Sequence, residues 1–137
     1  MNYQLLFVYG TLMSGLSAHS FLIDSAFISH GILYGARLIH LSEGYPAVVE
    51  GEGRVFGEVY RVDDLTLKAI DLFEDFNELF PEESFYIRKM KQVRLIPMNE
   101  FVEAWAYFLN PSLVESLEFT EVPFGNWKEF LKNLLKL

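Results

Sequence analysis

The sequence predicts an α+β fold built mainly from strands, with helices packed beside a curved sheet. The expected elements follow one another as strands, a helix, further strands and a final helix, which is not the strict alternation of a doubly wound sheet. Glycines interrupt long apolar segments, as is typical of bulges and corners in a curved sheet. The chain has 137 residues, of which 51% are hydrophobic. It is therefore expected to form one domain, residues 1–137, with a substantial core.

The segments with the composition of strands are 4–9, 26–41, 46–50, 54–62, 84–96 and 101–109. The first is a short apolar run that Gly10 ends abruptly. Within the longest, Gly31 and Gly35 indicate kinks. Asn99 and Glu100 are predicted to form the hairpin turn between the last two strands.

Helices are expected between and after these strands. Asp63 and Asp64 are predicted to cap the first helix. Its apolar face, which is expected to pack on the sheet, has the helical spacing of Leu65, Ala69, Leu72, Phe73 and Phe76. A short helix or turn is predicted over 16–23, and an irregular or helical stretch begins at Pro111. Asn126 is predicted to cap a terminal helix, with Glu129 as its partner in a capping box. The apolar stripe of that helix consists of Trp127, Phe130, Leu131, Leu134 and Leu135.

The composition excludes several classes of protein. Cysteine is absent and the net charge is −8 at pH 7. Disulfides, thiolate zinc sites and covalent catalysis through cysteine are therefore excluded. The N-terminal segment lacks the pattern of a secretory signal, and the longest apolar runs are too short to span a membrane. The sequence therefore predicts a cytoplasmic protein with no membrane partner.

The acidic charge balance argues against a nucleic-acid partner, because binding to phosphates needs clustered Lys and Arg. The one basic cluster consists of Arg88, Lys89, Lys91 and Arg94, within a segment of alternating apolar residues. This pattern favours the solvated face of a strand. A homodimer is compatible with the apolar content, although the sequence identifies no specific interface.

No cofactor is expected. His19, His30 and His40 lack the spacing of metal ligands. The chain contains no glycine-lysine phosphate loop, no dinucleotide fingerprint after the first strand and no serine in a nucleophile elbow. His19 is close enough in sequence to Gly10 to reach a pocket there, but structural histidines are commoner.

The junction at Tyr9-Gly10-Thr11-Leu12 is the most informative feature of the chain. A strand that ends at such a glycine can hold a carboxylate or a carbonyl oxygen on successive backbone amides. The alternative is a simple turn after an edge strand, since turns that contain glycine are common. The local pattern leaves both interpretations open.

Further segments place this junction in a wider context. In chain order they are Gly44-Tyr45-Pro46-Ala47, Gly57-Glu58-Val59-Tyr60, Ile70-Asp71-Leu72-Phe73-Glu74, Tyr86-Ile87-Arg88 and Gly125-Asn126-Trp127. Together with the first junction they resemble, in order and spacing, the motifs of the γ-glutamylcyclotransferase-like family, also called AIG2-like or BtrG-like. Asn126 stands where the family usually has aspartate, and it can still cap a helix. The resemblance implies a small mixed-strand β-barrel with flanking helices.

The resemblance also implies a reaction and its residues. Members of the family release 5-oxoproline and a free amine from a small γ-glutamyl substrate by intramolecular attack of the α-amine. It implies that Glu74 is the catalytic acid and base and that Tyr9, Gly10, Thr11 and Leu12 bind the substrate. Burial and the nearby carboxylates Asp71, Asp75 and Glu78 are expected to raise the pKa of Glu74. Without the resemblance, Glu74 would be interpreted as a solvated residue at a helix end.

Other residues have two interpretations. Tyr86 is implied to border the pocket, or it is a core tyrosine beside a solvated Arg88. Tyr45 and Pro46 form a pocket wall or merely a turn, whereas Trp105 and Tyr107 are expected in the core. The acidic segment 77–83 is expected to edge the pocket and to discourage acidic leaving groups. A non-catalytic binding or interaction module with the same fold remains the alternative function.

Overall fold

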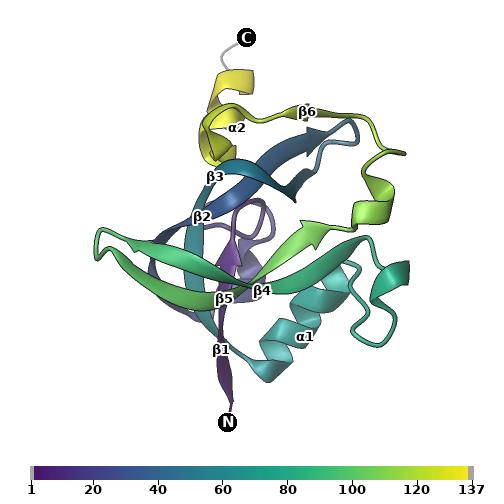
Figure 1. Ribbon diagram of the computed structural model, residues 1–137. Coiled ribbons are helices and arrows are strands. Elements are labelled where there is room, and N and C mark those ends of the chain that lie inside the picture. The colour runs from purple at the N-terminus through teal and green to yellow at the C-terminus, as the bar shows by residue number, and fades with distance from the viewer. Residues whose placement is uncertain (1, 136–137) are drawn as a thin grey trace.

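The computed structural model of the protein describes residues 2–135 (Figure 1). Its strands are β1 (Tyr3–Val8), β2 (Ala26–Leu41), β3 (Pro46–Asp63), β4 (Tyr86–Ile96), β5 (Glu100–Leu109) and β6 (Phe119–Glu121). Its α-helices are α1 (Asp64–Phe73) and α2 (Trp127–Leu135). Short 3₁₀ turns are η1 (His19–Leu22), η2 (Pro81–Glu83), η3 (Pro111–Leu113) and η4 (Pro123–Gly125).

The strand pairings close into a ring. β1 pairs antiparallel with β3 and parallel with β5, and β5, β4, β2 and β3 then pair antiparallel in that order. The short β6 extends the second half of β2, on the edge that β4 occupies along the first half. Helix α1 lies below the β4–β5 hairpin and α2 lies at the opposite end of the molecule (Figure 1). This arrangement confirms the predicted α+β fold with a mixed-strand sheet and flanking helices.

The second and third strands of the ring form its largest pairing. β2 has the predicted bounds, and it shifts register between Tyr34 and Ala36, where Gly35 has a φ of 73°. The prediction of two strands over 46–50 and 54–62 is wrong, because β3 is continuous. The glycines between the two segments indicated a break, but the bulged partner strand follows the same curve and the pairing continues across it.

Helix α1 has the predicted N-cap but a different buried face. Asp63 accepts a hydrogen bond from the backbone amide of Thr66 at 2.7 Å, as expected of an N-cap. The predicted contact face is wrong, since Leu65 and Leu72 are 78% and 82% exposed. The residues that α1 buries are Leu67, Ile70 and Asp71. The helix therefore turns a polar residue, Asp71, toward the sheet.

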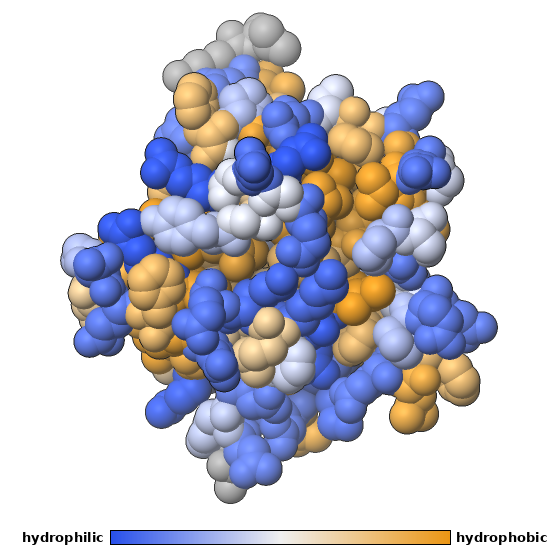
Figure 2. Space-filling model, viewed as in Figure 1, coloured by the Kyte–Doolittle hydropathy of each residue, from blue (hydrophilic) through white to orange (hydrophobic). Residues whose placement is uncertain are grey.

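One hydrophobic cluster forms the core, with contributions from every strand of the ring. Trp127 of α2 is 2% exposed, and Asn126 caps this helix by accepting a hydrogen bond from the Glu129 amide at 3.1 Å. Phe130 and Leu131 pack against the core, Leu134 is exposed, and the side chain of Leu135 lies outside the described part. The surface in Figure 2 is largely hydrophilic, with hydrophobic residues gathered at its upper right. None of the described helices has the length and apolar character needed to cross a membrane.

Candidate active site

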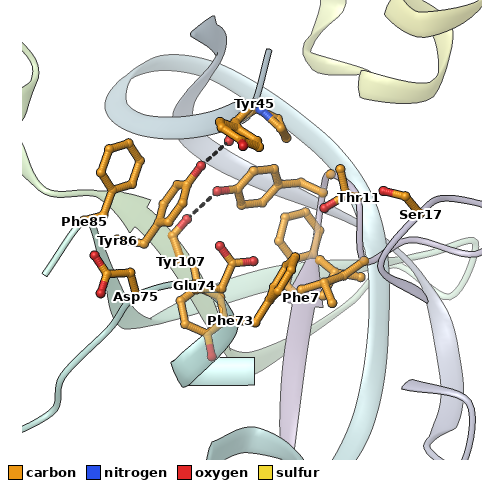
Figure 3. Close-up of a pocket in the computed structure, with 15 residues that line it drawn as sticks. Phe7, Thr11, Ser17, Tyr45, Phe73, Glu74, Asp75, Phe85, Tyr86 and Tyr107 are labelled. Atoms are coloured by element: carbon orange, nitrogen blue, oxygen red, sulfur yellow. Dashed lines mark hydrogen bonds between the residues drawn. The ribbon is translucent and has the colours of Figure 1, made fainter. Parts of the chain in front are cut away.

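All the site residues predicted from the sequence line one cavity of about 470 Å³. Its walls come from the end of β1 and the loop after it, the turn between β2 and β3, the end of α1, the start of β4 and the end of β5. The predicted residues among them are Tyr9, Gly10, Thr11, Leu12, Glu74 and Tyr86. Ring closure thus brings together segments that are far apart in the sequence (Figure 3).

We call residues 9–12 the signature loop. Its carbonyl groups are held by the protein: the Gly10 oxygen accepts from the Met13 amide at 3.0 Å and the Thr11 oxygen from the Ala18 amide at 2.9 Å. The amides of Gly10, Thr11 and Leu12 donate to no other described residue. A run of unpaired amides beside a cavity is a site for a carboxylate or an oxyanion.

Glycine at position 10 is required by a close contact. A Cβ atom built on Gly10 would lie 2.5 Å from Cγ of Pro46, which is well inside van der Waals contact. The φ angle of Gly10 is not among the positive values, so backbone freedom is not the reason for this glycine. Pro46 forms the facing wall of the cavity, which means that the packing of the proline on Gly10 sets the position of the loop.

Glu74 caps the C-terminal end of α1, where its backbone amide donates to the Ile70 oxygen at 2.8 Å. The side chain points into the space bounded by Tyr107, Phe7 and Phe73 (Figure 3). Burial raises the pKa of the Glu74 carboxyl to about 7. The additional effect expected from Asp71, Asp75 and Glu78 is not observed, since burial is the sole cause of the shift.

Asp71, one turn before Glu74, has a cation beside it. Nε of Arg88 lies 2.9 Å from Oδ1 of Asp71, and Nη2 of Arg88 also donates to Glu78 at 3.1 Å. The prediction that Arg88 is solvated is wrong, because its side chain is 7% exposed and its guanidinium stacks on Trp105. Strand β4 curves over α1 at this point, so its alternating side chains no longer divide into a solvent-exposed row and a buried row.

Three tyrosines build the wall beside Glu74. The Tyr9 hydroxyl donates to the Tyr107 carbonyl at 2.7 Å, and the Tyr86 hydroxyl donates to the Pro46 carbonyl at 2.7 Å (Figure 3). The Tyr107 hydroxyl donates to Asp71 at 2.5 Å. Burial above all raises the pKa of each of these phenols, so all three stay protonated at neutral pH.

The lining residues carry little charge. Glu74 and Asp75 are the charged residues among them, and the lining includes no Lys, Arg or His. The expectation that segment 77–83 edges the cavity is wrong, since none of its residues is in the lining. Asp75, with a φ of 54°, instead brings an exposed carboxylate to the rim.

Several residues depart from the sequence-based interpretation. His19 lines a different cavity, and its Nδ1 lies 2.9 Å from the Leu12 carbonyl oxygen. Tyr107 was expected in the core, and it is both buried and part of the lining. Its place opposite Arg88 in the β4–β5 register is the signal that could have identified it. Among the described residues, no group of three His, Asp or Glu side chains is placed to hold a metal ion.

Comparisons with known proteins identify the family of the chain. The sequence profile of the family described as gamma-glutamyl cyclotransferase, AIG2-like, matches residues 6–129. The gamma-L-glutamyl-butirosin B gamma-glutamyl cyclotransferase of Niallia circulans is 28% identical over 125 residues, which cover 91% of this chain and 76% of that protein. The gamma-glutamylaminecyclotransferase of Bos taurus is 35% identical over 94 residues, which cover 59% of this chain and 54% of that protein.

Among solved structures, the crystal structure of an AIG2-like protein from Mus musculus is similar with a TM-score of 0.70 at 27% identity. The similarity covers 93% of this chain and 95% of the mouse protein. The family profile spans the signature loop, the end of α1 and the start of α2. The chain therefore belongs to the gamma-glutamyl cyclotransferase, AIG2-like family of enzymes.

Proposed function

We propose that the protein releases 5-oxoproline and a free amine from a γ-glutamyl compound, with Glu74 as the acid and base. One observation carries this proposal: a carboxyl group with a pKa of about 7 lines the same cavity as three residues whose backbone amides are unpaired. A proton acceptor with a pKa near the operating pH is effective in general acid–base catalysis. Unpaired amides stabilise negative charge without a cation.

The substrate carries both reacting groups, so the enzyme has to bend it into an attacking shape. The α-amine must approach the γ-carbonyl carbon, and such positioning accounts for a large part of the barrier in intramolecular reactions. The amides of Gly10, Thr11 and Leu12 bind the α-carboxylate or the carbonyl oxygen. The aromatic walls formed by Phe7 and Tyr107 exclude water from the folded substrate.

The proton transfers balance around Glu74. The carboxylate takes a proton from the α-ammonium, and the free amine attacks the γ-carbonyl carbon to form the new C–N bond. Protonated Glu74 then gives its proton to the leaving nitrogen, and the regenerated carboxylate takes the second proton from the ring nitrogen as the old C–N bond breaks. The released amine takes this second proton from Glu74 and departs as an ammonium ion.

Incubation with a panel of γ-glutamyl compounds tests the proposal, with detection of 5-oxoproline as the measurement. The panel includes a γ-glutamylamine and γ-L-glutamyl-butirosin B, because the Bos taurus and Niallia circulans relatives are named for these compounds. The Glu74→Gln variant is expected to lose release while it keeps the fold. Glu52→Gln is the matched control, since this exposed carboxylate of β3 lies outside the cavity lining. An active Glu74→Gln variant would eliminate Glu74 as the proton carrier.

The alternative is a binding module that keeps the fold and the cavity without catalysis. A binder of γ-glutamyl groups gains nothing from a partly buried base, so the raised pKa of Glu74 favours the enzyme. Binding of a γ-glutamyl compound by the wild-type protein without any 5-oxoproline would favour the module. A cytoplasmic location and a single domain over residues 1–137 stay predictions.

A further inference from the structure

Glu58 is a buried carboxylate that the proposed reaction does not use. Its side chain is 2% exposed and lies in β3 opposite Val8, the last residue of β1. A buried carboxylate is costly unless it is paired and hydrogen-bonded. The burial of Glu58 therefore depends on the groups that bond to its carboxylate.

Four donors surround this carboxylate. One oxygen accepts from the Ser14 amide at 2.8 Å and from the Tyr60 hydroxyl at 2.9 Å. The other accepts from the Ser14 hydroxyl at 2.9 Å and from Nζ of Lys128 at 3.1 Å. Burial acts to raise the pKa of Glu58, but the hydrogen bonds from Ser14 and Lys128 outweigh it and lower the pKa below the usual range. Glu58 is thus charged at neutral pH and bonds both polar groups of Ser14.

Ser14 lies two residues after the signature loop, and it lines a different cavity. Ser14, His19 and Glu58 line a second cavity of about 320 Å³, whereas residues 9–12 line the first. His19 contacts the Leu12 carbonyl and Glu58 contacts Ser14, so the segment is attached at two points to residues that line the second cavity.

These attachments determine where the free amides point. In a planar peptide the N–H lies opposite the preceding carbonyl, so a fixed carbonyl fixes the direction of the next amide. The Gly10 carbonyl accepts from the Met13 amide, and the amide of the next residue, Ser14, donates to Glu58. We propose that Glu58 is a positioning residue, which fixes Ser14 and thereby Met13 and the Gly10 carbonyl, so that the Thr11 amide is aimed into the substrate cavity.

This inference rests on the proposed function for its kinetic test. In Glu58→Gln, one oxygen is replaced by an NH₂ group that faces the Lys128 ammonium and the Ser14 hydroxyl, so the four bonds cannot all form. Misplacement of substrate-binding groups by a fraction of an ångström to an ångström reduces rates by up to about a hundredfold. We therefore expect kcat/KM for 5-oxoproline release to fall between about tenfold and a hundredfold, with a smaller fall in Ser14→Ala, which keeps the amide bond.

A matched control separates positioning from a general loss of stability. Val93 is fully buried in β4 and lines neither cavity. Val93→Ala is expected to lower the melting temperature without changing kcat/KM at temperatures where the protein stays folded. An equal fall of kcat/KM in Val93→Ala and Glu58→Gln would overturn the proposal, as would an unchanged kcat/KM in Glu58→Gln.

A second measurement does not depend on activity. In a ¹⁵N-labelled protein, Glu58→Gln is expected to shift the amide resonances of Gly10, Thr11 and Leu12 more than Val93→Ala does. If the wild-type protein releases no 5-oxoproline, the proposed function fails, and these resonances still decide whether Glu58 positions the loop. Signature-loop resonances that stay in place in Glu58→Gln would refute the positioning role.

Discussion

Asp71 and Glu74 lie one turn apart at the end of α1, and the fold places them in opposite environments. Asp71 faces the Arg88 guanidinium and accepts a hydrogen bond from the Tyr107 hydroxyl. Glu74 faces the cavity, and burial without a compensating partner raises its pKa to about 7. One carboxylate is bonded to a cation and a phenol as part of the wall, and the other is free to exchange protons near neutral pH.

The pH dependence of activity should report the titration of Glu74. As the base, Glu74 must be ionised in the free enzyme, so we expect kcat/KM to rise with pH through a midpoint near its pKa of about 7. The measurement is the initial rate of 5-oxoproline release at a series of pH values from about 5 to about 9. A rising limb centred near the ordinary glutamate pKa would contradict this assignment.

The stability of the protein should also depend on Glu74 and pH. A carboxyl whose folded-state pKa is raised from 4.5 to about 7 stabilises the folded state below the unfolded pKa. That contribution is lost as the pH rises from the unfolded-state pKa of 4.5 through the folded-state pKa of about 7. Relative to wild type, Glu74→Gln is therefore expected to gain stability between pH 4 and pH 8, by on the order of 3 kcal/mol. Urea unfolding of both proteins at the two pH values measures this difference, and parallel pH profiles would contradict it.

Removal of Arg88 should disturb both the fold and the titration of Glu74. Arg88→Met leaves Asp71 as a buried charge without its partner, which is expected to cost about 3 kcal/mol of stability. The unbalanced negative charge near Glu74 should move the rising limb of the activity profile to higher pH. Lys91→Met removes a cation from an exposed pair with Glu50 and serves as the control. An unshifted limb in a folded Arg88→Met protein would speak against this coupling.

An added methyl group at position 10 should move the signature loop. In Gly10→Ala the new Cβ would lie 2.5 Å from the Pro46 ring, so the loop or the proline must shift. We expect kcat/KM to fall by about a hundredfold, because the amides leave their positions. Gly51→Ala is the control: its Cβ would meet the flexible Arg37 side chain, away from the cavity. Equal activity of the two variants would show that the contact with Pro46 does not matter.

The rim should favour a cationic leaving group. Asp75 lies at the rim, and the lining contains no basic side chain. We therefore expect faster turnover of γ-glutamyl-lysine than of γ-glutamyl-glutamate, by about tenfold, and Asp75→Asn should narrow the gap. The ratio of the two kcat/KM values measures this preference, and a preference for the glutamate compound would end the hypothesis.

Local chemistry in the sequence was sufficient for elements whose signals are short-range. The bounds of β2, the Asp63 cap and the Asn126 cap were all predicted from neighbouring residues. The buried face of α1 was not, because spacing alone cannot tell which of two apolar rows meets the sheet. The break within β3 was also wrong, since the continuity of a strand depends on its bulged partner.

In the candidate site, too, some features could be predicted from the sequence and others depend on long-range packing. The signature loop and Glu74 could be predicted because the motif resemblance assigns them a shared role, and the structure places them at one cavity. The burial of Arg88 and the place of Tyr107 depend on the β4–β5 register and on the curl of the strand over α1. Such long-range packing cannot be predicted from the sequence of β4 or of β5 alone.

The two sides of the cavity offer opposite hydrogen-bonding groups. The signature loop offers N–H donors. The hydroxyls of Tyr9, Tyr86 and Tyr107 donate their protons to other protein groups, so toward a ligand they can act only as hydrogen-bond acceptors. A zwitterionic amino acid head group matches both sides in a single orientation, with its carboxylate toward the loop and its ammonium toward the phenols and Glu74. Inversion of the α-carbon would exchange these two groups, so we expect the cavity to distinguish the two enantiomers of a γ-glutamyl substrate.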